Sequence, residues 1–412
     1  MDKYFDVAPQ VHFLPEYDMH TSTEWNGIRA FWYEGAMYKG QKTKVFAMIG
    51  YPEIKNREKV PAVVLVHGGG GHPYAEWIRR WNEKGFAAIA MDTTGYFPSN
   101  EYKGLVGTEN PNEGHKFTRE LYGELKEEGY TVGPDNSEMT DCNLPREEQW
   151  MYHAVVDTIL AHNILRCDSC VDNDKIGISG ISWGGVITSI AIGYDNRYAF
   201  AIPVYGSGYL DCFPSPKLPQ IFGTEQVAKQ WSAASRFYNV TFPVLWMCYL
   251  QDTCFTFGAN SLSYKATKKA NSFLSIKQSM KHSHKNAWSA TEGYRFAEKV
   301  LNNKLPFIKY EEFLNASEKL SVEIEVPDDF ENISAEVFYV MEPLQYDEKD
   351  KLINQWESVQ ARIQNGMIYA AIPKDVFGYY LELKAYVGEE CYISTSEWCD
   401  RSEVYANDRH VW

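Results

Sequence analysis

The sequence lacks any apolar run that approaches the roughly 20 residues of a membrane-spanning helix. Its first residues, MDKYFDVAPQVHFLPEYD, contain no apolar core of a signal peptide, so we expect a cytoplasmic protein. Basic residues are outnumbered, because 40 Lys and Arg stand against 55 Asp and Glu. This balance disfavours a basic stripe that would bind nucleic acid or anionic lipid. We therefore expect neither a nucleic-acid nor a membrane partner.

Cysteines are also few, with eight in 412 residues. Cys167 and Cys170 form a CxxC, but no second pair stands at the spacing of a zinc site. A redox CxxC would begin a helix, whereas this one follows a predicted helix. We therefore expect ordinary reduced thiols.

The last quarter of the chain is poor in glycine and in basic residues. Residues 311–412 hold 3 of the 29 glycines and 8 of the 40 Lys and Arg, but 22 of the 55 Asp and Glu. Short alternating segments, such as Ser321–Val326, favour strands, and Asn365-Gly366 is a strong hairpin signal. We predict a domain boundary near residue 310, followed by an acidic antiparallel β-sandwich over 311–412. Its charge is interpreted as a solvated outer face.

Residues 1–310 show a different pattern. An alternating segment at 31–50 predicts antiparallel strands as an N-terminal extension. Continuous apolar runs, which are typical of strands buried on both faces, lie at 61–66, 86–91, 176–178, 200–205, 244–250 and 274–277. Helical periods separate several of these runs. Strands that alternate with helices predict a doubly wound, mostly parallel α/β sheet.

One segment of this region breaks the alternation. Residues 95–146 are rich in Gly, Pro, Asn and charge, and they contain no long apolar strand. Long connections of this kind are usually functional lids or insertions. We predict a lid-like insertion over about 95–146.

The sharpest motif is Gly180-Ile-Ser-Trp-Gly-Gly185, which follows a predicted strand and precedes a predicted helix. A serine on a strained strand-to-helix turn exposes its hydroxyl, and the crowded backbone needs small residues two positions before and after it. The helix N-terminus adds backbone N–H groups that can bind a developing oxyanion. We interpret Ser182 as a nucleophile and the Trp183 N–H as one oxyanion donor.

A second glycine loop, His67-Gly-Gly-Gly-Gly71, follows the predicted strand 61–66. It has neither GxGxxG nor a GK[ST] ending, so a phosphate loop is disfavoured. This loop lies upstream of the strand-to-helix turn at Ser182, which we call the elbow. That position suits the other half of an oxyanion hole. We expect Gly69 to supply that N–H and His67 to be structural.

A serine nucleophile needs a base and an acid that orients it. In this architecture the chain order is Ser, then Asp or Glu, then His. Asp252 follows a buried strand and is the expected acid. Two histidines follow the last strand; we favour His282 as the base, with His284 as the alternative. A serine mechanism of this kind needs no metal or organic cofactor, so we expect none.

The sequence resembles α/β-hydrolases of the acetyl xylan esterase and dienelactone hydrolase type over about residues 30–300. The matching stretches are 61–92, 149–166, 174–185, 200–210, 242–255 and 274–288. The resemblance implies the same roles for Ser182, Asp252 and His282. The sequence departs from the family pattern at Leu250, where relatives commonly have glycine. It also departs in the insertion over about 95–146, where no substrate pocket can be matched.

The expected activity is hydrolysis of small acyl esters, acetyl above all, from a small ester or an acetylated carbohydrate. The alternative is a prolyl-oligopeptidase-like peptidase, which would need a group that holds the peptide amino terminus. Glu124, Glu127 and Glu128 are candidates, but a solvated helix face explains them more simply. A non-catalytic binding protein is disfavoured by the complete set of triad candidates. A homo-oligomer remains open.

Overall fold

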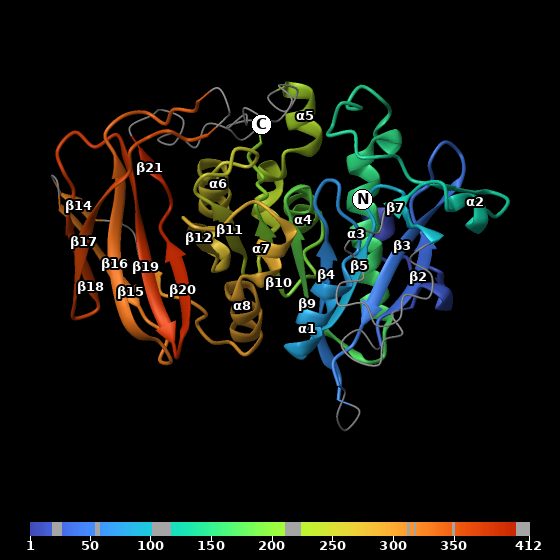
Figure 1. The fold of residues 1–412 in the computed structure, drawn as a ribbon, viewed down its shortest axis with the longest axis horizontal. Helices are drawn as coiled ribbons and strands as arrows, with labels where there is room; N and C mark the ends of the chain where they lie inside the picture. Colours follow the sequence, from blue (N-terminus) through green and yellow to red (C-terminus); the bar gives the residue numbers. More distant parts are fainter. Residues whose placement is uncertain are drawn as a thin grey trace.

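A computed structural model of the chain describes residues 1–18, 27–53, 58–100, 117–210, 224–310, 314–316, 319–347 and 351–400. Figure 1 shows a central sheet flanked by helices, with a β-rich C-terminal region on its left-hand side. Part of the predicted insertion, 101–116, and Cys212 lie outside the described residues. The other seven cysteines are free thiols.

The centre of the fold is a run of parallel strands in the order β5–β4–β9–β10–β11–β12. Their bounds are β4 Val60–Val66, β5 Ala87–Met91, β9 Val171–Ile181, β10 Phe200–Val204, β11 Leu245–Tyr249 and β12 Phe273–Lys277. Nearly all residues of β4, β5 and β10 are buried. The continuous apolar runs therefore form strands that are covered on both faces, as predicted.

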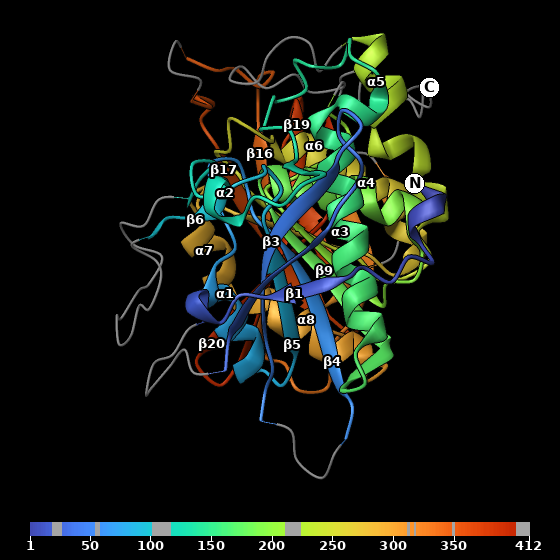
Figure 2. The ribbon, with the colours of Figure 1, turned by 90° about the vertical axis from the view of Figure 1, so that its right-hand side faces the viewer.

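Helices cover both faces of this sheet, as Figure 2 shows in side view. The helices are α1 Ala75–Glu83, α2 Tyr122–Leu125, α3 Trp150–Cys167, α4 Trp183–Tyr194, α5 Glu225–Trp231, α6 Phe257–Thr267, α7 His284–Ser289 and α8 Thr291–Leu301. Val64 and Val66 of β4 pack in one apolar core with α3, α4 and α6. Val63 and Leu65 point the other way, into a second core with α1 and α8. The alternation of side chains along a strand thus creates the two layers.

The predicted parallel run forms the core of a larger sheet, which is mixed as a whole. Strands β1 Val11–Phe13, β2 Arg29–Glu34 and β3 Lys42–Gly50 extend it antiparallel beyond β5. At the other side, β12 pairs antiparallel with β20, Glu390–Thr395, through Leu274 and Thr395. Antiparallel strands therefore flank the parallel run on both sides.

The insertion contains only short elements among its described residues. These are β6 Phe97–Pro98, β7 Phe117–Thr118, α2 and β8 Tyr130–Val132, followed by the 3₁₀ turn Arg146–Glu148 before α3. Strand β8 pairs in parallel with β3. Arg119 Nη2 donates to the backbone oxygens of Thr94 and Gly133, at 2.7 and 3.1 Å. Arg119 therefore ties the start of the insertion to the segment around Gly133.

The C-terminal region consists of antiparallel strands. Their bounds are β13 Lys309–Tyr310, β14 Leu314–Ala316, β15 Lys319–Glu325, β16 Glu331–Val340, β17 Glu357–Gln364, β18 Met367–Ala371, β19 Gly378–Val387, β20 and β21 Cys399–Asp400. Asn365 and Gly366 have φ values of 51° and 73° and join β17 to β18, so the predicted hairpin turn is confirmed.

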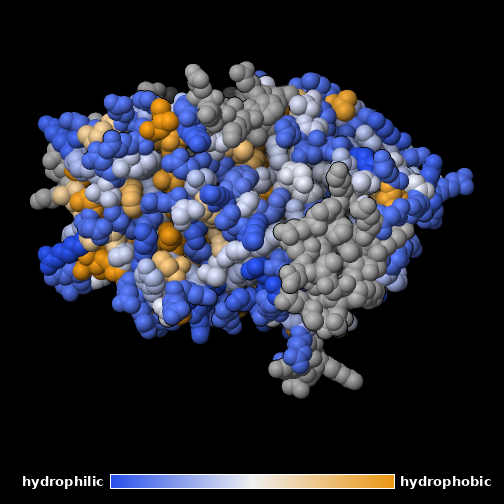
Figure 3. Space-filling model, viewed as in Figure 1, coloured by the Kyte–Doolittle hydropathy of each residue, from blue (hydrophilic) through white to orange (hydrophobic). Residues whose placement is uncertain are grey.

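The surface seen in Figure 3 is mainly hydrophilic, and its hydrophobic residues form small separate patches, most of them over the C-terminal strands. Within the described residues, no helix is both long and apolar enough to cross a membrane.

Candidate active site

Ser182 lies at the sharp turn between β9 and α4, with φ 60° and ψ −121°. Its N–H donates to the Val204 oxygen at 2.8 Å, which holds the turn against the end of β10. A methyl group at Gly180 would lie 2.1 Å from the Gly184 oxygen, and one at Gly184 would lie 2.0 Å from the Val66 oxygen. Both flanking glycines are therefore required by the close approach of backbone segments.

His282 connects the serine to an aspartate. Its Nε2 lies 2.8 Å from Ser182 Oγ, and its Nδ1 lies 2.7 Å from Asp252 Oδ2. The three residues follow β9, β12 and β11, whose C-terminal ends meet at one edge of the parallel sheet. This arrangement permits proton transfer from the serine hydroxyl to an imidazole that a carboxylate orients.

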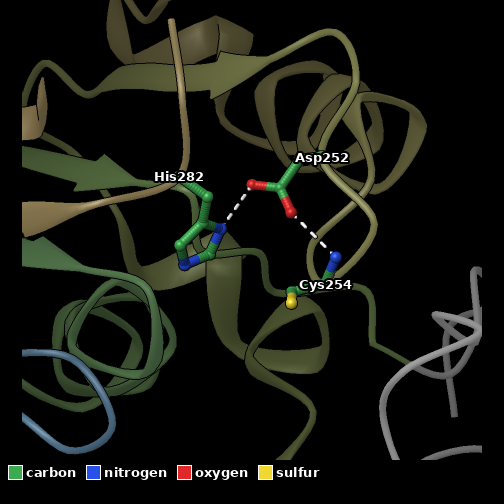
Figure 4. Close-up of side chains that lie close together, drawn as sticks. All are labelled: Asp252, Cys254 and His282. Carbon is green, nitrogen blue, oxygen red and sulfur yellow. Dashed lines mark hydrogen bonds and ion pairs between the residues drawn. The ribbon is translucent and has the colours of Figure 1, made fainter. Parts of the chain in front are cut away.

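Asp252 is almost completely buried, with 3% of its surface exposed. Its second oxygen, Oδ1, accepts the backbone N–H groups of Cys254 and Phe255 at 2.8 and 3.0 Å. Figure 4 shows His282 and Cys254 on opposite sides of the carboxylate. Leu250 is not in the left-handed region, so this turn forms without a glycine at that position.

Tyr205 was not singled out by the sequence, although it ends a predicted strand. Its ring stacks on the His282 imidazole, with centroids 4.7 Å apart and planes 18° apart. Its hydroxyl donates to the oxygen of Lys281, the residue before the histidine, at 2.7 Å. The Phe255 ring lies nearly parallel to the imidazole at 6.2 Å. Aromatic packing thus fixes the plane of the base.

His284, the alternative base, occupies a different position. Its Nε2 accepts the N–H of Gly68 at 2.9 Å, which ties the histidine loop to the glycine loop. Burial lowers the pKa of His284 to about 3, so the ring is a neutral acceptor near neutral pH. The structure therefore brings His282, and not His284, to the serine and aspartate.

The two residues predicted to supply the oxyanion donors are in contact. A methyl group at Gly69 would lie 2.8 Å from Trp183 Cδ1, so the glycine loop rests directly on the first residue of α4. The Gly68 N–H is already bonded to His284, which leaves the next N–H of the loop for a ligand. The Trp183 ring packs edge-on against Trp150 at 5.4 Å and Phe255 at 5.7 Å.

His67 lies below this loop and makes only structural contacts among those described. Its Nδ1 lies 2.8 Å from the Gly68 oxygen, and its Nε2 accepts the Thr93 N–H at 3.1 Å. The acceptor role of Nε2 places the proton on Nδ1, which donates to the carbonyl. The ring therefore braces β4 against the end of β5.

The three acidic residues nominated for a peptide amino terminus do not form a cluster with the triad candidates. Glu124 accepts from Asn100 Nδ2 at 2.8 Å, and Glu127 pairs with Lys44 at 3.4 Å. Glu127 and Glu128 lie beyond the end of α2. No contact of the described residues links these carboxylates to Ser182.

One group of metal-ligating side chains occurs in the described part of the chain. Ligand atoms of Asp252, Cys254 and His282 lie within 4.8 Å of one another. However, Asp252 and His282 are hydrogen-bonded at 2.7 Å, and the other carboxylate oxygen holds two N–H groups. A cation here would have to displace these bonds, so the donor set fits a triad better than a metal site.

Two family models match the chain. Acetyl xylan esterase (AXE1) matches residues 12–213, and the prolyl oligopeptidase family matches residues 146–309. No curated protein matches the chain significantly.

The chain is also similar to solved hydrolase structures. Acetyl xylan esterase 1 from Thermoanaerobacterium sp. JW/SL YS485 is 16% identical, with 73% of this chain and 93% of that chain covered and a TM-score of 0.47. The Paenibacillus sp. R4 acetyl xylan esterase is 20% identical, with coverages of 72% and 91% and a TM-score of 0.48. The Pyrococcus horikoshii acylaminoacyl peptidase is 17% identical, with coverages of 70% and 43% and a TM-score of 0.46.

The acetyl xylan esterase match starts before β2 and includes the elbow serine, while the prolyl oligopeptidase match includes the aspartate and both histidines. The match to the acetyl xylan esterase model over residues 12–213 supports a serine carboxylic ester hydrolase.

Proposed function

We propose that Ser182, His282 and Asp252 form the catalytic triad of this esterase, and that it removes small acyl groups, acetyl above all, from carbohydrate hydroxyls. The observation that carries the proposal is the position of His282, which bonds Ser182 at 2.8 Å and Asp252 at 2.7 Å. The acyl specificity rests on the acetyl xylan esterase family match.

In the proposed reaction, Ser182 Oγ attacks the ester carbonyl while His282 Nε2 takes its proton. Asp252 keeps the Nδ1 proton in place and stabilises the imidazolium. The N–H groups of Gly69 and Trp183 receive the negative charge of the tetrahedral oxygen. His282 then returns the proton to the leaving alcohol, and water repeats the sequence on the acyl-enzyme.

The first test uses a fluorophosphonate probe and p-nitrophenyl acetate, with aminoacyl-p-nitroanilides as competing substrates. We expect labelling at Ser182 and acetate release, both abolished in Ser182→Ala. Amide cleavage with little acetate release would favour a peptidase, the second family that matches residues 146–309. An unlabelled wild type would contradict the triad.

The base is tested by a matched pair of variants. The kcat of His282→Ala should be lower by a factor of about 10⁴ or more, because the members of a triad act as a unit and the loss of one disables the others. His284→Ala should retain far more activity, because this ring bonds Gly68 and not the serine. A greater loss in His284→Ala would reverse the assignment.

We further propose that residues 311–412 are a second unit, built as an antiparallel sandwich on the edge strand β12. Its support is the pairing of β15 with β14 and β18, and of β16 with β17 and β19. The shift in charge and glycine content near residue 310 agrees with this division.

A further inference from the structure

The insertion carries a polar side chain to the glycine loop. A methyl group at Gly69 would lie 3.4 Å from Asn136 Nδ2 and 2.8 Å from Trp183 Cδ1. Asn136 and Trp183 therefore cover the same side of Gly69, although they come from different segments. Asn136 is half-buried.

The orientation of this amide is defined by its oxygen. Asn136 Oδ1 lies 2.9 Å from the Glu138 backbone N–H, which can only donate. The oxygen must therefore face Glu138, and the NH₂ group faces Gly69. None of the hydrogen bonds found among the described residues uses Asn136 Nδ2 as its donor.

The backbone that presents Asn136 is strained. Glu138 and Met139 are consecutive non-glycine residues with φ values of 48° and 65°. Such residues are unfavourable, and they cluster at ligand clamps and active sites, where the surrounding structure enforces them. Here Met139 is buried, with 1% of its surface exposed, and Asp135 accepts from the Tyr96 hydroxyl at 3.0 Å.

We propose that Asn136 is a further catalytic residue, whose Nδ2–H donates a hydrogen bond to the carbonyl oxygen of the ester beside the Gly69 N–H. The inference rests on the proposed function. A neutral amide suits this position because it stabilises the developing oxyanion and is not titrated. No covalent bond to Asn136 forms, and no proton leaves it. The insertion thereby completes a site that the two glycine loops begin.

The decisive variant is Asn136→Asp, which has the same shape. Its carboxylate still accepts from Glu138 N–H but offers no donor toward Gly69 and places negative charge near the oxyanion. We expect kcat for p-nitrophenyl acetate to fall by about 10²-fold or more, the effect of losing one oxyanion donor, with a smaller change in KM. If Asn136 only holds the loop through Oδ1, the aspartate variant will match wild type, and the proposal fails.

Two more variants separate donor loss from charge and from folding. Asn136→Ser has a hydroxyl that can accept from Glu138 N–H without reaching Gly69, and it should lose kcat similarly without an added charge. Asn100→Ala removes an amide of the same insertion that bonds Glu124, and it should keep wild-type kcat. Equal kcat in wild type and in a folded Asn136→Ser, verified by thermal unfolding, would overturn the proposal.

The rate of fluorophosphonate labelling distinguishes failure of this inference from failure of the proposed function. A phosphonate oxygen occupies the oxyanion position, so Asn136→Asp should be labelled more slowly than wild type. Unlabelled wild type would refute the triad itself. Labelled wild type with an equally fast Asn136→Asp would refute only the role of Asn136.

Discussion

At the scale of single residues, neighbouring histidines in one loop have separate tasks. His282 bonds the serine and the aspartate, whereas His284 accepts from Gly68 and packs against Tyr74 at 4.9 Å. Both follow the same strand, so sequence position alone favours one without excluding the other. The geometry separates them because one imidazole reaches across the strand ends and the other turns to the glycine loop.

The buried neutral His284 makes stability depend on pH. Its pKa is lowered from 6.5 to about 3 by loss of hydration on burial, so the folded state binds fewer protons than the unfolded state between these values. Stability should therefore fall as the pH falls from about 6.5 towards 3. We expect His284→Gln, which keeps an acceptor, to show a shallower fall in Tm over this range.

The matched control for this measurement is Ser182→Ala, which leaves His284 in place and should keep the wild-type slope. Part of the slope should persist in His284→Gln, because burial also lowers the pKa of His153, to about 4. An unchanged slope in His284→Gln would contradict the assigned burial of a neutral imidazole.

The residues that sequence reasoning did not identify share one property: their roles come from contacts between distant segments. Tyr205 lies at the end of β10, yet its ring and hydroxyl serve a loop 76 residues later. Asn136 lies in an insertion without periodicity, so no pattern connects it with Gly69. The nucleophile motif, by contrast, could be identified because its strand, turn and helix are contiguous.

At the scale of elements, the elbow depends on the distance between β4 and α4. Gly184 in the first turn of α4 lies directly against the Val66 oxygen, where an added methyl would be 2.0 Å away. The strands were predictable because they are continuous apolar runs that must be buried on both faces. The order of the strands across the sheet was not, since pairing partners are far apart in the chain.

Gly184→Ala should therefore destabilise the protein by at least about 1–3 kcal/mol, as overpacking does, and displace the elbow. The expected result is a lower Tm together with strongly reduced kcat for p-nitrophenyl acetate. Gly123→Ala is the control, since an added methyl there meets no atom within 4 Å and should lower neither quantity. Wild-type Tm and kcat in Gly184→Ala would contradict the packing described for the elbow.

At the scale of the whole molecule, the acidic C-terminal region is tied to the hydrolase region at several points. Thr395 of β20 pairs with Leu274 of β12, and the Trp398 N–H donates to Ser261 Oγ at 2.6 Å. Arg295 of α8 forms a bidentate ion pair with Asp329, in which Nη2 lies 2.8 Å from Oδ1 and Nη1 lies 3.0 Å from Oδ2. The change in composition near residue 310 thus indicated where the C-terminal region begins. It did not predict the strand pairing, hydrogen bond and ion pair that join the two regions.

This connection predicts cooperative unfolding. We expect urea transitions followed by far-UV circular dichroism and by tryptophan fluorescence to coincide, because the regions share a sheet and a core. Asp329→Asn should shift the midpoints of both transitions to the same lower urea concentration. Its pKa is held well below the ordinary value, chiefly by hydrogen bonds from Arg295, so its charge stabilises the fold at neutral pH.

Two separated transitions, with only one affected by Asp329→Asn, would show that residues 311–412 unfold independently. The control is Glu389→Gln at an exposed position of the C-terminal region, which should leave the midpoint unchanged.

The order of the strand ends has a consequence for synthesis. Ser182, Asp252 and His282 follow β9, β11 and β12, so the proposed nucleophile is translated 100 residues before the proposed base. A nascent chain that ends between them carries the serine without the imidazole that would deprotonate it. β12 then gains its outer neighbour β20 only when the C-terminal region has been made. If these three residues form the proposed triad, hydrolytic activity requires that synthesis has passed His282.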